Sequence, residues 1–248
     1  MTVGIRNPLG GRSMPGGAGV AIARPGAHLI AVAIGVIGLM WLLGSWLVSD
    51  TVPTFLRRAD TQSSAWVADH RTAALNGVTH VGSMMADTII ALVVTTVAVV
   101  VLRVWLGRWR ESLVTVIAVV GELLIFLVIT ATVHRARPAV PQLDQAPPTS
   151  SFPSGHTGAA MALYGCLAVI LLRNVKPRWV AVGLAVVGFT VPILVAASRV
   201  YRGMHYPTDV LAGAIASGIW LLAVVLVLLR PDRRPHRSRS TSSPESVA

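Results

Sequence analysis

The chain alternates between long apolar runs and short polar segments. Each run has about 20 residues, which is enough for an α-helix to cross the hydrocarbon core of a membrane. Continuous runs of this kind are typical of membrane spans, whereas a soluble domain would show amphipathic stripes. We therefore predict an all-α fold, a bundle of six transmembrane helices. The predicted spans are residues 27–48, 84–106, 112–133, 155–172, 179–197 and 207–229.

The segments outside the runs predict the domain organisation. Residues 1–26 are rich in Gly, Pro and Arg and lack hydrophobic periodicity, so we expect a flexible cytoplasmic arm. Residues 27–229 form the predicted membrane domain, whose first run is too long for the apolar part of a signal peptide. Residues 64–81 place apolar side chains loosely at helical spacing, which predicts a helix lying at the membrane surface. Residues 230–248 are basic and then Ser-rich, which predicts a disordered cytoplasmic tail.

Composition and charge support a membrane protein. Hydrophobic residues make up 54% of the chain and charged residues only 12%, whereas about 25% is usual in a soluble domain. The net charge of +11 is compatible with an anionic partner, but most basic residues flank the apolar runs, so we expect no nucleic-acid partner. Two thirds of the 21 Lys and Arg residues lie in the arm, the tail and the loops on their side. Basic residues favour the cytoplasmic side, which predicts cytoplasmic termini in a multi-pass plasma-membrane protein.

Polar residues are concentrated in three clusters at the edges of apolar runs. The clusters are HRARP at 134–138, SFPSGHT at 151–157 and SRVYRGMHYPTD at 198–209. The first two clusters lie at the two ends of the loop between the third and the fourth predicted span, and the third cluster lies between the fifth and the sixth. In a six-span topology these two loops lie on one face of the membrane. We therefore expect the clusters to meet at one surface, on the extracytoplasmic side.

The clusters carry groups suited to binding phosphate. Several arginines share the face without an equal number of acids, and the guanidinium group presents a planar fork of donors to phosphate oxygens. Ser154 and Gly155 stand at the start of a predicted helix, where free N–H groups and the helix dipole favour an anion. The arginines on this face are Arg135, Arg137, Arg199 and Arg202.

Two histidines on this face are candidates for catalysis. His205 and Asp209 are four residues apart, and helical spacing would place the carboxylate against one imidazole nitrogen. That contact would fix the tautomer and leave the other nitrogen as a nucleophile. His156 lies on a different predicted helix and would be free to protonate a leaving oxygen.

Three motifs in these clusters occur in order and in register. They resemble the type 2 phosphatidic acid phosphatase superfamily, also called the lipid phosphate phosphatases. The pattern of that family is Lys-x6-Arg-Pro, then Pro-Ser-Gly-His, then Ser-Arg-x5-His-x3-Asp. The resemblance covers the third to the sixth predicted helix. The matching residues are Arg137-Pro138, Pro153-Ser154-Gly155-His156, Ser198-Arg199, His205 and Asp209.

The resemblance implies the reaction and the role of each matching residue. It implies metal-independent hydrolysis of a lipid phosphate through a phosphohistidine intermediate, without a cofactor, and the sequence offers no cluster of metal ligands. By this likeness His205 is the nucleophile, Asp209 its orienting partner and His156 the general acid. The implied phosphate-binding residues are Arg137, Ser154, Gly155 and Arg199.

One position departs from the family pattern. The lysine of the first motif falls at position 130, where this chain has Thr130. The loss of one charged contact of this kind costs about 1.5–3 kcal/mol, which is enough to slow catalysis or change substrate preference. Arg135 and His134 lie on the same short loop and are the candidates to replace the missing cation.

We therefore predict an integral membrane phosphatase of lipid phosphates or diphosphates. Polyprenyl diphosphate, phosphatidic acid and phosphatidylglycerol phosphate are the candidate substrates. Polyprenyl diphosphate is slightly favoured, by family analogy, because an outward-facing site suits recycling of a cell-wall lipid carrier. One alternative is a phosphotransferase that passes the phosphoryl group to a lipid or sugar acceptor. Another is a catalytically degenerate lipid-binding protein, for which Thr130 is the only argument.

Two acidic residues have two interpretations each. Glu122 lies in the middle of the third predicted span, where an acid is either functional or a neutral, hydrogen-bonded structural group. Asp87 lies near one end of the second predicted span. It either reaches the active site or caps a helix.

Overall fold

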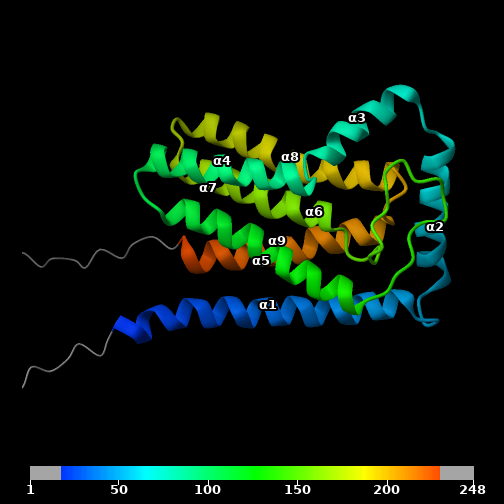
Figure 1. Ribbon diagram of the computed structural model, residues 1–248, viewed down its shortest axis with the longest axis horizontal. Coiled ribbons are helices and arrows are strands. Elements are labelled where there is room, and N and C mark those ends of the chain that lie inside the picture. The colour runs from blue at the N-terminus through cyan, green and yellow to red at the C-terminus, as the bar shows by residue number, and fades with distance from the viewer. Residues whose placement is uncertain (1–17, 230–248) are drawn as a thin grey trace, which may run out of the picture.

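Six long apolar helices in the described part of the chain confirm the predicted membrane bundle. The computed structural model describes residues 18–229, and the six helices run along a common axis in Figure 1. Their bounds agree with the predicted spans to within a few residues, apart from an extended start of the first. Five of them are α1 (Ala18–Val48), α4 (Thr88–Leu106), α5 (Arg110–Thr132), α8 (Arg178–Tyr201) and α9 (Pro207–Leu228). The remaining one is continuous and consists of α6 (Gly155–Ala160), a π-helical turn (Met161–Gly165) and α7 (Cys166–Asn174).

Local sequence signals explain where several helices begin and end. The side chain of Asp87 accepts a hydrogen bond from the backbone N–H of Ile89 (3.1 Å), so this residue caps α4. Gly107 ends α4 with φ of 65°, a left-handed conformation that glycine adopts without strain. Pro207 occupies the first turn of α9, where its missing N–H costs no hydrogen bond.

The outer faces of the helices are apolar, as the membrane prediction requires. Ile89, Val104 and Trp179 each expose more than 70% of their surface. A soluble protein would pay for leaving so much apolar surface in contact with water, whereas lipid chains cover it without cost. The interior is closely packed, and a Cβ atom on Gly121 of α5 would lie 2.1 Å from the ring of Trp220 on α9.

Two segments differ from the sequence prediction. Instead of one surface helix at 64–81, the structure has α2 (Thr54–Asp69) and α3 (Ala73–Met84). The break arises because Thr72 is extended and its side chain caps the new helix α3. The predicted arm also ends earlier than expected, since α1 already begins at Ala18. The rest of the predicted arm and the predicted tail lie outside the described residues.

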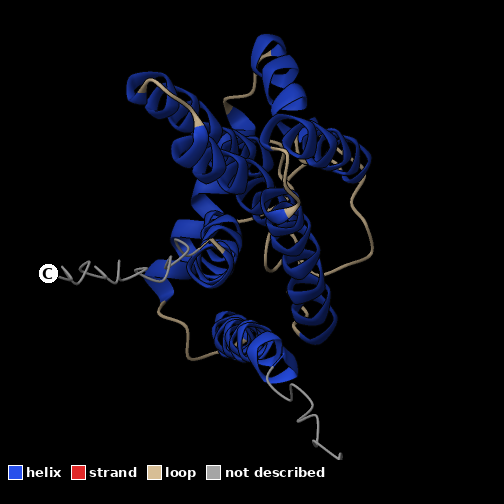
Figure 2. Cartoon of the chain, turned by 90° about the vertical axis from the view of Figure 1, so that its left-hand side faces the viewer, coloured by secondary structure: helices blue, strands red, loops and turns tan. Residues whose placement is uncertain are grey.

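The bundle has two distinct ends. The start of α1 and the end of α9 lie at one end, and the loop before α6, the loop before α9, and helices α2 and α3 gather at the other (Figure 1). Helix α2 runs across the ends of the spans (Figure 1). Helix α1 stands at the edge of the bundle (Figure 2), where it contacts α5 and α9. The three polar clusters therefore meet at one end, as their spacing predicts.

Candidate active site

A cavity of about 570 Å³ opens at the end of the bundle where the clusters meet. One part of its wall is polar and comes from all three motifs, and the other part is apolar and comes from α4 and α5. Such a cavity suits a ligand with a charged head and an apolar body. The polar residues of the wall include Thr130, Arg137, His156, Arg199 and His205, and the apolar ones include Leu92, Val119, Leu123 and Leu127.

Arg137 and Arg199 present unpaired donors at this cavity. Arg137 donates from Nη1 to the carbonyl oxygen of Met204 (2.8 Å), and Arg199 donates from Nη1 to Ser83 Oγ (2.7 Å) and to Asp144 (3.0 Å). The Nε–H of each arginine is buried and has no hydrogen-bond partner among the described residues. A buried donor without a partner costs about 1–3 kcal/mol. Both guanidinium groups that line the cavity are therefore incompletely paired.

The environment of His205 favours a neutral imidazole. The ring is 4% exposed, and its Nδ1 donates to the carbonyl oxygen of Ser151 (2.7 Å). A carbonyl oxygen only accepts, so the proton sits on Nδ1 and Nε2 keeps its lone pair. Burial, and then the charges of Arg199 and Arg137, hold the pKa of His205 well below its ordinary value. The imidazole is therefore neutral across the physiological range.

Asp209 lies near His205 but does not hydrogen-bond it, which corrects the expectation from their spacing. Asp209 Oδ2 is 3.9 Å from His205 Nδ1. It accepts instead from the backbone N–H of Tyr206 (2.9 Å) and from the hydroxyl of Ser151. The reason is that His205 precedes the first turn of α9, so the i,i+4 geometry of a continuous helix does not apply. The observed connection between Asp209 and the ring runs through Ser151, whose hydroxyl donates to Asp209 and whose carbonyl oxygen accepts from His205.

The PSGH motif divides its residues between two environments. His156, in the first turn of α6, and Gly155 both line the cavity. A Cβ atom at Gly155 would lie 2.8 Å from the ring of Phe126, so this close approach requires glycine. Ser154 is fully buried and lies outside the wall of this cavity. Its hydroxyl accepts from Thr157 Oγ1 (3.0 Å), and the expected contact of this side chain with phosphate stays a prediction.

Arg135 is not part of the cavity wall, contrary to its predicted role in binding phosphate. Its guanidinium group donates to Asp60 (2.7 Å) and to Asp209, and it lies 4.5 Å from the centre of the Tyr206 ring. His134 is exposed and is also absent from the wall. Neither residue therefore lines the cavity in the place of the missing lysine.

Thr130 does line the cavity, and its buried hydroxyl has no hydrogen-bond partner among the described residues. Arg202, the other basic candidate, donates twice to Asp144, at 2.8 and 2.6 Å. Of the arginines expected to bind phosphate, Arg137 and Arg199 thus line the cavity, together with Thr130.

Sequence reasoning missed Asp144, a residue of the loop between the first two motifs. It accepts from both Arg199 and Arg202 and keeps these two like charges close together. Burial alone would raise the pKa of Asp144, but its hydrogen bonds and charge interaction with Arg202, and the charge of Arg199, hold that pKa below its ordinary value. A single acid in a Pro-rich loop carries no sequence signal of this role.

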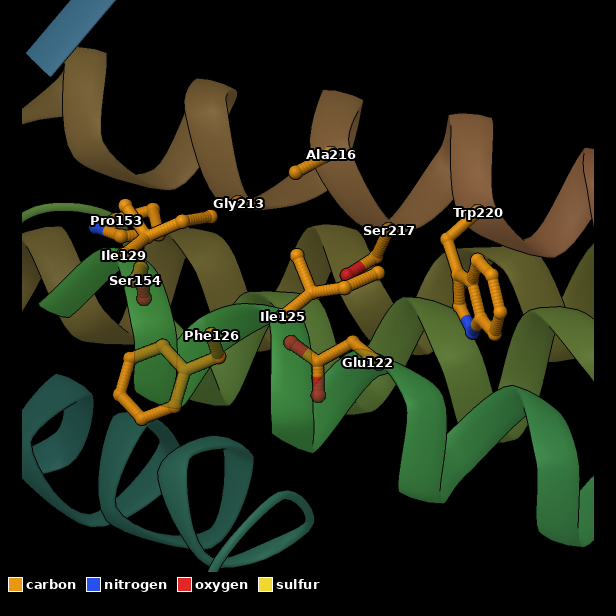
Figure 3. A pocket seen from close by; sticks show the side chains of 10 residues that line it. All are labelled: Glu122, Ile125, Phe126, Ile129, Pro153, Ser154, Gly213, Ala216, Ser217 and Trp220. Atoms are coloured by element: carbon orange, nitrogen blue, oxygen red, sulfur yellow. The ribbon is translucent and has the colours of Figure 1, made fainter. Parts of the chain in front are cut away.

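Glu122 lies deeper, between α5, α6 and α9. Figure 3 shows its carboxyl group beside Ser217, with Trp220 one turn further along α9. The side chain hydrogen-bonds Ser217, and its Oε1 would lie 2.1 Å from a Cβ atom on Gly158. Glu122 also lines the apolar part of the main cavity. Glu122 of α5 therefore packs against both α6 and α9, beneath the polar part of the cavity wall.

Comparisons with known proteins agree with this geometry. Residues 111–233 match the PAP2 superfamily. Undecaprenyl-diphosphatase BcrC of Bacillus subtilis is 30% identical over 172 residues, which cover 64% of this chain and 83% of that protein. An undecaprenyl-diphosphatase of Sulfolobus acidocaldarius is 35% identical over 79 residues, which cover 32% of this chain and only 34% of that protein.

Solved structures show the same fold. The PAP2-type phosphatidylglycerolphosphate phosphatase of Bacillus subtilis superposes with a TM-score of 0.70 at 20% identity, covering 82% of this chain and 98% of that one. LpxE of Aquifex aeolicus superposes with a TM-score of 0.53 at 19% identity, covering 69% and 95%. On the motifs, the cavity, the six spans and these relatives, the chain belongs to the PAP2 superfamily and is one of its membrane phosphatases.

Proposed function

We propose that this protein removes the terminal phosphate from a polyprenyl diphosphate through a phosphohistidine intermediate on His205. The observation that carries the proposal is the cavity, because it is lined by His205, whose ring is neutral, and by Arg137 and Arg199, each of which keeps a buried Nε–H without a partner among the described residues. Its apolar part fits a lipid chain. Both curated relatives are named undecaprenyl-diphosphatase, which favours a diphosphate over phosphatidic acid or phosphatidylglycerol phosphate.

The first step transfers the phosphoryl group to the enzyme. Nε2 of His205 attacks the terminal phosphorus, a P–N bond forms, and the P–O bond to the bridging oxygen breaks. His156 gives its proton to that oxygen, so the lipid leaves as a monophosphate. The phosphorylated ring carries a proton on Nδ1 and is positively charged. The nearby carboxylate of Asp209 stabilises this charge.

The second step restores the enzyme. A water molecule attacks the phosphorus, and the now neutral His156 takes one of its protons. The P–N bond breaks, orthophosphate leaves and the electron pair returns to Nε2 of His205. Throughout both steps Arg137 and Arg199 stabilise the charge that develops on the phosphoryl oxygens.

Phosphate release by the detergent-purified protein tests this proposal. The assay contains a chelator and compares polyprenyl diphosphate, phosphatidylglycerol phosphate and phosphatidic acid. His205→Ala is run beside the wild type, and acid-quenched samples with labelled terminal phosphate are checked for acid-labile label on the protein. We expect release to be fastest from the diphosphate and absent in the variant. Equal release by the His205→Ala protein, or a wild type without release from any of the lipids, would overturn the proposal.

We also propose that the site faces the extracytoplasmic side of the plasma membrane, since two thirds of the Lys and Arg residues belong to the predicted arm and tail and to the loops expected on their side of the membrane. Cys166 is the only cysteine and is fully buried, so single introduced cysteines report topology. Gln62→Cys on α2 and Lys176→Cys between α7 and α8 replace exposed residues at opposite ends. A membrane-impermeant maleimide should label intact cells at position 62 and not at position 176. The reverse pattern would place the site on the cytoplasmic side.

A further inference from the structure

A buried ion-pair network joins the surface-crossing helix α2 to the catalytic loop. Asp60 of α2 is 3% exposed. Its Oδ2 accepts from Arg135 Nη2 (2.7 Å) and from the hydroxyl of Thr208 (2.6 Å), and its Oδ1 accepts from the backbone N–H of Thr208 (3.2 Å). None of the family motifs includes Asp60, and it lies outside the wall of the cavity.

The network continues from Arg135 to the nucleophile. Arg135 Nη1 donates to Asp209 Oδ1, and Asp209 Oδ2 accepts from the Ser151 hydroxyl. The main chain of Arg135 also binds Ser151, because the carbonyl oxygen of Arg135 accepts from the N–H of Ser151 (2.9 Å). Ser151 in turn accepts from Nδ1 of His205 (2.7 Å). Each link is a direct contact, and the chain of contacts runs from Asp60 to the reacting imidazole.

The sharing of Arg135 between two carboxylates has an electrostatic consequence. A guanidinium group paired with Asp209 alone would neutralise the carboxylate that stabilises the charged phosphohistidine. Because the guanidinium group of Arg135 also pairs with Asp60, it neutralises Asp209 less completely. More of the negative charge of Asp209 therefore remains available to His205. Asp60 also prevents the guanidinium group from turning and pulling Asp209 away from Ser151.

We propose that Asp60 is a positioning residue of the active site, which acts through Arg135 to keep Asp209 and Ser151 in the geometry that His205 requires. This inference rests on the function proposed above. Asp60 touches neither the cavity nor the substrate, so its removal affects the chemical step and leaves substrate binding unchanged.

The first test compares Asp60→Asn with Asp69→Asn, which changes an exposed acid of the same helix. Phosphate release from polyprenyl diphosphate gives kcat and KM for each full-length protein in detergent. In Asp60→Asn we expect kcat to fall about tenfold, because a displacement of catalytic groups by a fraction of an ångström slows the reaction by this order. The KM of this variant should stay within about twofold of the wild type, and Asp69→Asn should match the wild type in both constants.

The second test asks whether Asp60 acts through Arg135. Arg135→Gln and the double variant Asp60→Asn/Arg135→Gln complete a double-mutant cycle. If Asp60 acts through Arg135, the double variant has the same kcat as Arg135→Gln alone. Should Asp60→Asn fail to fold, Thr208→Val removes the bridging hydroxyl and keeps all three charges, and its kcat should fall with KM unchanged.

The outcomes separate this inference from the proposed function. An active wild type whose Asp60→Asn form has normal kcat overturns the inference alone. Multiplicative losses in the cycle overturn it too, because they show that the two residues act independently. An Asp60→Asn variant with a raised KM and an unchanged kcat would also overturn the inference. A wild type without phosphate release overturns the proposed function and this inference together.

Discussion

Arg135 and Arg137 are two residues apart in one motif, yet the fold gives them opposite environments. Arg135 is enclosed by two carboxylates, a hydroxyl and an aromatic ring. Arg137 has a carbonyl oxygen at 2.8 Å and a hydroxyl at 3.5 Å, and its buried Nε–H has no partner among the residues described. A satisfied arginine stabilises the protein, whereas an unsatisfied one is ready for a ligand. The number of acceptors around each guanidinium group decides which role it has.

Removal of Arg135 should have the largest effect on stability. Arg135→Gln leaves the buried carboxylates of Asp60 and Asp209 without a cation, which typically costs about 3–5 kcal/mol. Thermal unfolding in detergent measures this loss, with Arg58→Gln, an exposed arginine of α2, as the control. If Arg135→Gln and Arg58→Gln had equal melting temperatures, the contacts of Arg135 would not stabilise the protein as we expect.

Removal of Arg137 should instead affect activity. Arg137→Gln should lower kcat/KM by about 10²–10³-fold, the usual range for one preorganised donor to a transition-state charge. It should weaken inhibition by orthovanadate in parallel, and it should leave the melting temperature equal to or above that of the wild type because a poorly paired buried charge is gone. If Arg137→Gln were destabilised and kept its affinity for vanadate, Arg137 would serve stability and not ligand binding, contrary to our prediction.

A variant of Asp144 tests how much an acid that pairs with two arginines contributes to stability. Asp144→Asn weakens the hydrogen bonds to Arg199 and Arg202 and should cost about 1.5–3 kcal/mol at neutral pH. The folded-state pKa of Asp144 is lowered, so its contribution is complete above the ordinary carboxyl pKa of about 3.9 and is lost as pH falls through the lowered value. Melting temperatures measured from pH 7 downward should therefore converge for wild type and variant. A gap that stays constant to the lowest pH would contradict this assignment.

Thr130→Lys should have the smallest effect. It adds a third cation to the cavity wall beside Arg137 and Arg199, at a position where the hydroxyl now has no partner. We expect a gain of about tenfold in vanadate affinity, equivalent to about 1.4 kcal/mol. Thr132→Lys, an exposed position on the same helix, is the control. A loss of affinity in Thr130→Lys alone would show that the hydroxyl serves the ligand better than a cation.

Sequence patterns were sufficient for the bundle and for the motif residues that line the cavity. The six spans follow from run length, and the position of the motifs at alternate loops places His156, His205 and Arg199 on one face. The break between α2 and α3 was not predicted, because a weak amphipathic pattern does not reveal that Thr72 caps a new helix. The roles assigned to His205, Asp209 and His156 remain predictions until the variants are measured.

The sequence by itself determined the membrane bundle, the family and the residues that meet at one end, because hydrophobic run length and motif spacing are local properties of the chain. Only the tertiary structure decided which charges pair. Asp60 and Asp144 lie 75 and 55 residues from the arginines that they bind, and no local pattern connects residues so far apart. Their positions leave Arg135 satisfied and Arg137 open, since a buried guanidinium group pairs with whatever acceptors the packing of distant helices brings within reach.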